Sequence, residues 1–239
     1  YSSVWSLRCL LYLRGSADTG SCDDSGGYAE HVVCVTSSHF ASAEKEFRFP
    51  LDYGSQRPLS ASWTVTGSGA FALGLNQKCR AHITGMTPGR IVDYGLKDSM
   101  NMGACMAPAA ADTVARHMED FHVTPEEYDR IITGDLGSVG QTVLIDFLRE
   151  KGIDIADRHM DCGIEIFDAE AQDTHAGGSG CGCSAVTLAA YILPKLESGE
   201  WKKVLFLPTG ALLSKTSFNE GKSVPGIAHA VVLESPAVK

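Results

Sequence analysis

The sequence predicts an α/β fold with a mainly parallel sheet. Short apolar runs of strand length alternate along the chain with longer segments whose apolar residues recur at helical spacing. Several of the short runs are rich in β-branched residues, and the longer segments carry helix start and stop signals. Strands that alternate with helices are typical of a sheet whose neighbouring strands run parallel.

The strand-like segments begin near residue 31. The first, His-Val-Val-Cys-Val, is a short β-branched run, which is typical of a buried strand in a parallel sheet. The second contains a Gly-Ser-Gly break. The segments are His31–Val35, Trp63–Leu75, Arg80–Val92, Arg130–Thr133, Lys203–Leu207 and Ala228–Glu234.

Three segments have the pattern of a helix. Pro108–Phe121 opens with Pro and small residues, which predicts a helix that begins at the proline. Gln141–Lys151 is amphipathic and is followed by a terminating glycine, and Ser184–Leu196 is apolar. Thr124–Glu127 has the sequence of a capping box.

Composition is that of a globular protein. The 239 residues are 44% hydrophobic and 21% charged, and no apolar run is long enough to cross a bilayer. The formal net charge is −9 and the pI is about 5.3. Because the chain has no basic stretch to neutralise phosphates, we expect no nucleic-acid partner.

The eight cysteines are scattered among small or apolar neighbours, which favours free thiols in a reducing compartment over a disulfide framework. Cys181 and Cys183 are closer together than the usual zinc-binding pair. Cys162 and His175 lie near them in sequence, so a metal site is an alternative. Our prediction is that the chain binds no metal and no cofactor.

A glycine-rich segment, His175–Ser184, leads directly into a predicted helix. Glycines let a backbone approach a ligand closely, and a helix N-terminus offers free N–H groups to an anion or a carbonyl. The same glycines also suit close packing between helices. The sequence leaves both interpretations open.

Two acids follow predicted strands. Asp93 lies in the segment Arg90–Gly95, and Asp135 lies in Thr133–Gly137. Acids at strand ends stand where α/β sheets bind ligands. The alternative for both is a solvated loop acid or a helix cap.

A catalytic Cys–His pair is the obvious enzyme hypothesis for this composition. From Cys34 onward, however, no cysteine stands in a clear nucleophile elbow. His39, His82 and His229 are candidates by residue type alone.

Longer strings resemble the stage V sporulation protein AD family, over roughly residues 26–236 of this chain. The strings that carry the resemblance are Thr36–Glu44, Phe47–Pro50, Trp63–Ala70, Met106–Asp112, Thr133–Asp135, Asp161–Gly163, Ala176–Ala185 and Thr209–Ser214. The resemblance implies the thiolase fold, in which two similar α/β halves form αβαβα layers. It divides the chain into an aberrant segment at 1–25, the end of the first half at 26–79 and the second half at 80–239, so that most of the first half is missing.

The resemblance also implies a function. The family is linked to the uptake of dipicolinic acid into the developing spore, so we expect a non-catalytic protein that binds dipicolinate or its calcium chelate. Expected partners are spore membrane channel proteins and, at full length, a second copy of the chain. The expected location is cytoplasmic or peripheral at the spore inner membrane. The alternatives are an acyltransferase of the ketoacyl synthase III type and a structural subunit of a membrane channel complex.

Condensing enzymes of this fold use a Cys, a His and an Asn or second His. Here Gly134 and Asp135 stand where the first His is expected, and Gly182 stands near the position of the Asn. The loss of such oxyanion donors costs catalysis several kcal/mol, so we predict no catalytic residues. The Gly-Ala-Cys-Ser-Thr elbow of the family is expected at Arg8–Tyr12. Codons for these residues can encode that elbow one base out of frame, which favours a frameshift before about residue 26.

Five residues are predicted to bind the ligand. Asp93 is expected to face the chelated cation or a protonated carboxyl, with Arg90 as a charge partner. Gly178 and Ser179 are expected to offer N–H groups to a carboxylate. Asp135 is the second strand-end acid in the set.

Overall fold

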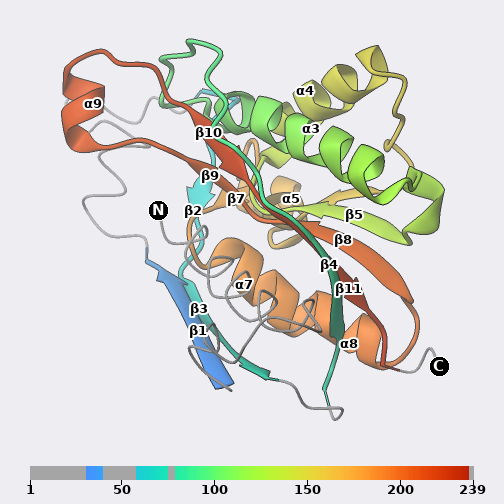
Figure 1. Ribbon diagram of the computed structural model, residues 1–239. Coiled ribbons are helices and arrows are strands. Elements are labelled where there is room, and N and C mark those ends of the chain that lie inside the picture. The colour runs from blue at the N-terminus through green and yellow to red at the C-terminus, as the bar shows by residue number, and fades with distance from the viewer. Residues whose placement is uncertain (1–30, 40–57, 75–78, 237–239) are drawn as a thin grey trace.

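The computed structural model describes residues 31–39, 58–74 and 79–236 and shows a layered α/β protein (Figure 1). Helices α3 (Met102–Phe121) and α4 (Gly137–Glu150) cover one face of a five-stranded sheet. Helices α7 (Cys183–Thr187) and α8 (Leu193–Glu197) cover the other face. The segment 1–25 assigned to a frameshift lies outside the described residues.

The five-stranded sheet has the order β4-β11-β8-β5-β6. Strand β5 runs parallel to both β6 and β8, whereas β11 runs antiparallel to both β8 and β4. The predicted parallel arrangement is confirmed for β5, β6 and β8, whereas β11 runs against both of its neighbours, so the sheet is mixed. The strand bounds are β4 His82–Thr87, β5 Arg130–Thr133, β6 His159–Asp161, β8 Lys203–Leu207 and β11 Ala230–Glu234.

Strand β8 explains why the sheet is buried on both faces. Leu205 and Leu207 belong to the core beneath α3 and α4, while Val204 and Phe206 belong to the core on the α7–α8 side. Successive side chains of a strand point to opposite faces, so a run of four apolar residues supplies both cores at once. The sheet thus stands between two hydrophobic cores.

Helix α3 begins six residues before the predicted start. The Asn101 side chain caps it by accepting a hydrogen bond from the backbone N–H of Ala104, and Pro108 lies inside the helix. The prediction that Pro108 opens the helix is therefore wrong. Asn is among the preferred N-cap residues, and the helix begins after Asn101 rather than at the proline.

The other predicted helices are confirmed with shifted bounds. Helix α4 starts at Gly137, before the predicted Gln141. The 184–196 segment forms α7 and α8 with a π-helical turn, η4 (Leu188–Ile192), between them. The capping box at Thr124 is confirmed at the start of a 3₁₀ turn, η3 (Pro125–Glu127).

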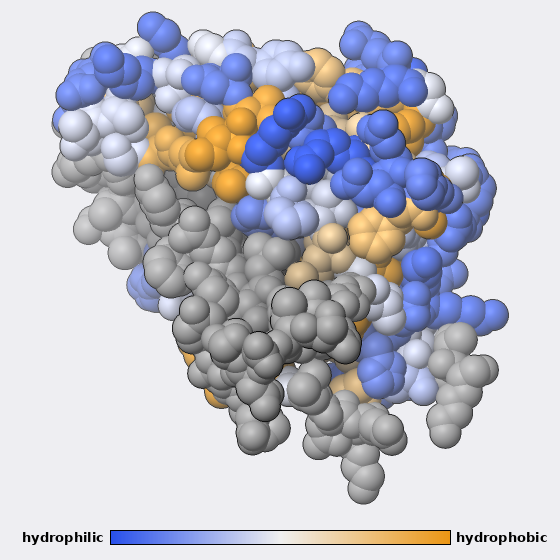
Figure 2. Space-filling view, viewed as in Figure 1, coloured by the Kyte–Doolittle hydropathy of each residue, from blue (hydrophilic) through white to orange (hydrophobic). Residues whose placement is uncertain are grey.

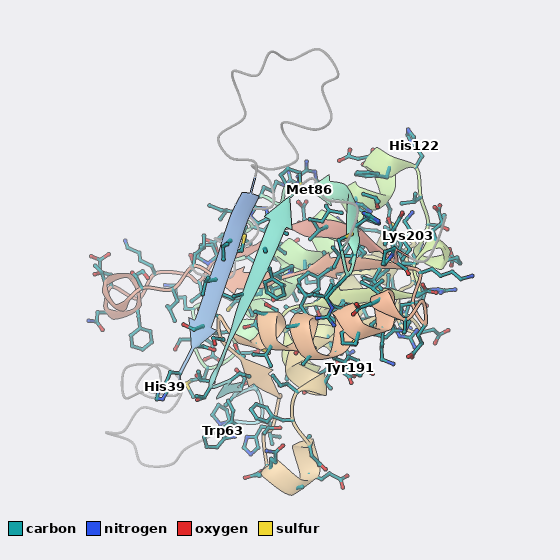
Figure 3. The ribbon with its side chains drawn as sticks, turned by 90° about the horizontal axis from the view of Figure 1, so that it is seen from below. His39, Trp63, Met86, His122, Tyr191 and Lys203 are labelled. Atoms are coloured by element: carbon teal, nitrogen blue, oxygen red, sulfur yellow. The ribbon has the colours of Figure 1, made fainter. Side chains whose placement is uncertain are left out.

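Strand β1 (His31–Ser38) differs from its prediction. It pairs antiparallel with β3 (Gly67–Gly74) in a separate two-stranded sheet, and the two strands lie side by side in Figure 3. Val33 and Val35 are 66% and 67% exposed, while Cys34 between them is buried. The prediction of a buried parallel strand is wrong, because a short β-branched run suits a half-exposed strand equally well.

The remaining elements are short. The predicted strands at 63–75 and 228–234 are each split, the latter at His229 into β10 and β11. Strand β2 pairs with β7, and β9 pairs with β10 in an arm that also carries α9, at the left of Figure 1. The bounds are β2 Trp63–Thr64, α5 Cys162–Glu165, α6 Ala169–Gln172, β7 Gly178–Ser179, β9 Thr209–Ala211, α9 Lys215–Asn219 and β10 Gly226–Ala228.

The surface shown in Figure 2 is mostly hydrophilic over the described residues, with smaller hydrophobic patches between. Within the described part of the chain, none of the helices combines the length and the apolar character that a membrane crossing requires.

Candidate functional site

A cavity of about 490 Å³ lies between the segment that joins β4 to α3 and the two helices α3 and α4. This volume is in the range of small-molecule sites. Arg90 and Asp93, both predicted from sequence, stand on its wall. The full lining is Arg90, Ile91, Val92, Asp93, Tyr94, Pro108, Ala111, Asp112, Phe147 and Lys151.

Arg90 is held in place by Asp112 of α3. Its Nε donates a hydrogen bond to Asp112 Oδ2 at 2.9 Å, and Nη2 donates to Oδ1. This two-point pairing raises the pKa of Arg90, first through the hydrogen bonds and then through charge attraction. The Arg90 side chain is 66% exposed, so its remaining N–H groups stay accessible at the cavity.

Asp93 is an exposed carboxylate with two donors. Ser223 Oγ donates to its Oδ2 at 2.6 Å, and the backbone N–H of Gly95 donates to Oδ1 at 2.8 Å. The hydrogen bond from Ser223, and then that from Gly95, lowers the pKa of Asp93. Asp93 therefore carries a negative charge at neutral pH.

The cavity also has an aromatic wall and a further cation. The rings of Tyr94 and Phe147 meet edge to face, with their centroids 5.4 Å apart. Lys151 follows the last turn of α4. Sequence reasoning missed Asp112, Phe147 and Lys151, since only the packing of α3 against α4 brings them to the segment that carries Arg90.

Asp135 belongs to a different place in the molecule. Its carboxylate accepts hydrogen bonds from Ser179 Oγ (2.8 Å), the backbone N–H of Gly180 (3.0 Å) and Thr209 Oγ1 (2.8 Å). The structure thus brings Asp135 and Ser179 together. Through these hydrogen bonds Asp135, in the loop after β5, connects that loop to the glycine-rich turn and to β9. None of these four residues lines the cavity of Arg90 and Asp93.

Gly178 and Ser179 form strand β7 and are both buried. They pair in parallel with Trp63 and Thr64 of β2. The turn that follows is packed against β1, since Ser38 Oγ of that strand accepts a hydrogen bond from the backbone N–H of Gly182 at 2.8 Å. A Cβ atom on Gly182 would lie 2.5 Å from the carbonyl oxygen of Gly67, so this turn needs its glycine for close backbone packing.

The buried acid Asp161 lies beside this turn. Its carboxylate accepts hydrogen bonds from the backbone N–H groups of Leu136, Gly137 and Gly163 and from the Thr133 hydroxyl. Burial raises the pKa of Asp161 to about 6, against the lowering effect of these donors. The carboxylate therefore fixes the start of α4 and of α5.

The described thiols are poorly suited to nucleophilic attack. Burial raises the pKa of Cys105 to about 11 and that of Cys162 well above its ordinary value. Cys34 and Cys183 are also buried, and Cys79 and Cys181 are partly buried. In the described ranges, no three His, Cys, Asp or Glu side chains are grouped so that they could hold a metal ion.

Of the three histidines singled out by residue type, His229 is nearest the cavity segment. Its Nδ1 accepts a hydrogen bond from the backbone N–H of Gly89 at 2.9 Å. His82 lies at the edge of the sheet, with Nδ1 3.3 Å from Cys79 Sγ. His39 lies just after β1 (Figure 3). None of the three lines the cavity.

Comparison with solved structures places the chain in the thiolase and ketoacyl synthase III fold. A tetronic acid condensing enzyme matches with a TM-score of 0.55 and 14% identity, over 97% of this chain and 65% of the enzyme. A 3-oxoacyl-[acyl-carrier-protein] synthase III from Aquifex aeolicus matches with a TM-score of 0.51 and 13% identity, over 97% and 63%. The predicted thiolase-like fold is confirmed.

The chain belongs to the stage V sporulation protein AD (SpoVAD) family, whose pattern it matches over residues 16–234. It is 44% identical over 209 residues to the Stage V sporulation protein AD of Bacillus subtilis. The match covers 87% of this chain and 61% of that relative, so the chain spans less than two thirds of the length of the relative. The predicted family is confirmed.

Proposed function

We propose that this protein binds dipicolinate in the cavity lined by Arg90 and Asp93, without chemical change to the ligand. The observation that carries the proposal is that these two residues, singled out from the sequence, share one cavity with two aromatic rings and a lysine. Dipicolinate is a planar aromatic ring with two carboxylates. A cavity with cationic donors and ring faces offers groups for both parts of such a ligand.

Arg90 and Asp93 carry opposite charges and are expected to contact different groups of the ligand. The N–H groups of Arg90 that Asp112 leaves unused are donors for a ligand carboxylate. Asp93 is ionised, so it serves as an acceptor for a protonated ligand carboxyl or as a contact for a calcium ion chelated by dipicolinate. The first contact requires no calcium, whereas the second does.

The protonation of two thiols and the hydrogen bonds of Asp135 favour ligand binding over acyl condensation. The raised pKa of Cys105 and of Cys162 opposes the thiolate form that attacks an acyl group. Asp135, which stands where a condensing enzyme has histidine, already accepts three hydrogen bonds from the chain itself. In the developing spore the bound dipicolinate would be passed to a membrane channel at the inner membrane, with this protein peripheral to it.

The test is calorimetric titration of the 239-residue chain with dipicolinate, with and without calcium, for the wild type and for Asp93→Ala. Asp93→Ala is expected to weaken binding by about tenfold, as the loss of one contact to a charged group predicts. A loss seen only with calcium assigns Asp93 to the cation, and a loss under both conditions assigns it to the carboxyl.

An unchanged affinity in Asp93→Ala would place dipicolinate outside this cavity. No binding by well-folded wild-type protein would overturn the proposal in favour of a structural subunit. Covalent labelling by an acyl-CoA would instead support the acyltransferase alternative.

A further inference from the structure

We propose that the cavity selects planar aromatic acids, with Lys151 pairing with a carboxylate and the Tyr94–Phe147 pair contacting the ring. The inference rests on the proposed function for the place where the ligand binds. It adds the residues that determine specificity. Neither Lys151 nor the aromatic pair was indicated by the sequence.

Lys151 is the cavity cation whose charge is not already balanced by a side chain. Arg90 forms two hydrogen bonds with the carboxylate of Asp112, so that pair is neutral as a whole. Lys151 is exposed and forms no ion pair with any residue in the described ranges. An incoming carboxylate therefore gains most from Lys151.

The backbone holds Lys151 at the cavity. It is the C-cap of α4, and its own N–H donates to the carbonyl of Leu148 at 3.0 Å. The next residue, Gly152, donates to the carbonyl of Arg149 at 2.9 Å. The helix end is therefore fixed, and only the flexible lysine side chain has to be ordered when an anion binds.

The aromatic pair supplies the second half of the selection. Tyr94 and Phe147 are tilted by 73°, an edge-to-face arrangement in which each ring keeps a face that the other does not cover. Tyr94 is 62% exposed, so its ring is open to a ligand. A flat aromatic ring stacks on such a face, whereas an aliphatic chain of the same length does not.

Negative charge at the cavity makes the ring contact more important for binding. Asp93 is a carboxylate on the same cavity wall that no cationic side chain neutralises in the described ranges, and it repels an ionised ligand carboxylate that no calcium ion bridges to it. An aliphatic dicarboxylate meets this repulsion with Lys151 and Arg90 alone. An aromatic acid adds ring contact, worth about 1 kcal/mol for a well-placed pair of rings, or roughly a fivefold gain in affinity.

The experiment is a calorimetric comparison of four probes on the 239-residue chain: dipicolinate, isophthalate, glutarate and benzoate. Isophthalate keeps the ring and both carboxylates without the ring nitrogen, and glutarate keeps a similar carboxylate separation without the ring. The variants are Lys151→Gln, Phe147→Leu and Tyr94→Leu. Lys202→Gln is the matched control, an exposed lysine that does not line the cavity.

Wild type is expected to bind the aromatic dicarboxylates at least about fivefold more tightly than glutarate. Lys151→Gln is expected to weaken every dicarboxylate by about tenfold, and Lys202→Gln to leave affinity within about twofold. Tyr94→Leu and Phe147→Leu are expected to weaken the aromatic ligands and to leave glutarate unchanged. Tyr94 is exposed, so its variant remains informative if Phe147→Leu unfolds the protein.

Equal affinity for isophthalate and glutarate would overturn the inference, as would a Lys151→Gln variant that behaves like Lys202→Gln. If dipicolinate binds and these results appear, the proposed function stands and the specificity assignment falls. If isophthalate binds as described but dipicolinate does not, the specificity assignment stands and the proposed function falls. If no probe binds to folded protein, both fall.

Discussion

His117 shows how a polar side chain is accommodated within the core beneath α3. The residue is fully buried, with Nδ1 2.7 Å from Thr87 Oγ1 and Nε2 2.6 Å from the Tyr128 hydroxyl. Its ring also stacks on Phe121, with the centroids 4.6 Å apart. Burial, and then the charge of Lys203, lowers the pKa of His117 to about 4. The imidazole is therefore neutral in the folded protein at pH 7.

This pKa makes the stability of the protein depend on pH. The ordinary value for His117 is 6.5, so between pH 6.5 and about 4 the unfolded chain binds a proton that the folded chain does not. The contribution of His117 to the stability of the protein is fully present above pH 6.5 and is lost as the pH falls through this window. At 1.4 kcal/mol per pKa unit, we expect a loss on the order of 3 kcal/mol in the free energy of unfolding. Urea unfolding at pH 7 and pH 4.5 measures it.

Among the described residues, His159 and Asp161 also have pKa values shifted within this range, so the effect is assigned by variants. His159 has a pKa lowered to about 4 by burial and acts in the same direction. Asp161, with its pKa raised to about 6, acts in the opposite direction as pH falls. His117→Gln is expected to reduce the loss between the two pH values, and the exposed control His82→Gln to leave it unchanged. Equal losses in the two variants would contradict the assignment.

At the residue scale the sequence predicted only part of the cavity. Asp93 and Arg90 could be singled out because an acid and a base at the end of a strand-like run are visible in one local segment. Asp112 and Phe147 come from α3 and α4, so their approach depends on how two helices pack over the sheet. Asp135 was singled out by the same strand-end rule, yet its carboxylate accepts hydrogen bonds from Ser179 and Thr209 and lies away from the cavity.

At the scale of elements, α3 and α4 pack unusually closely through glycines. A Cβ atom on Gly103 would lie 2.2 Å from the carbonyl oxygen of Leu136, and one on Gly140 would lie 2.9 Å from the backbone of Gly103. Both distances are too short for a methyl group beside backbone atoms. The two helices therefore meet backbone to backbone, and this contact sets the position of Phe147 and Lys151 at the cavity.

Gly103→Ala is expected to destabilise the protein by about 2 kcal/mol, although alanine is the better helix former by about 1 kcal/mol. The helix pair must separate to admit the methyl group, and the cavity changes shape with it. The free energy of unfolding in urea measures the loss. Ser138→Ala, an exposed change at the start of α4, is the matched control and is expected to stay within about 0.5 kcal/mol. A stabilised Gly103→Ala protein would show that the contact is not close.

Element types were predicted better than element partners. The strands at Arg130–Thr133 and Lys203–Leu207 are confirmed, since continuous apolar runs mark strands buried on both faces. The partners of β1 and β11 were not predictable, because periodicity within one strand does not depend on the direction of its neighbour. The early start of α3 was missed for another reason: Pro108 was taken as a start signal, whereas the Asn101 cap precedes it.

At the scale of the whole molecule, the layers differ in how completely they are enclosed. Strand β8 is paired on both sides, with β5 and β11, and its apolar side chains supply both cores. Strands β1 and β3 pair with each other in a two-stranded sheet, and Val33 and Val35 on its outer face are exposed. A two-stranded sheet has marginal stability by itself and depends on the layer against which it packs.

Local opening is therefore expected to be unequal across the layers. Backbone amides of β8 and β5 should exchange with deuterium at least about tenfold more slowly than those of β1 and β3, since exchange of the central strands requires disruption of both cores. Hydrogen exchange with mass spectrometry at pH 7 measures the difference. Equal protection would contradict the prediction and would mean that the β1–β3 layer unfolds only with the whole molecule. Slower exchange in the five-stranded sheet would instead show that the sheet and its helices, which form the cavity, stay folded while the outer strand pair opens.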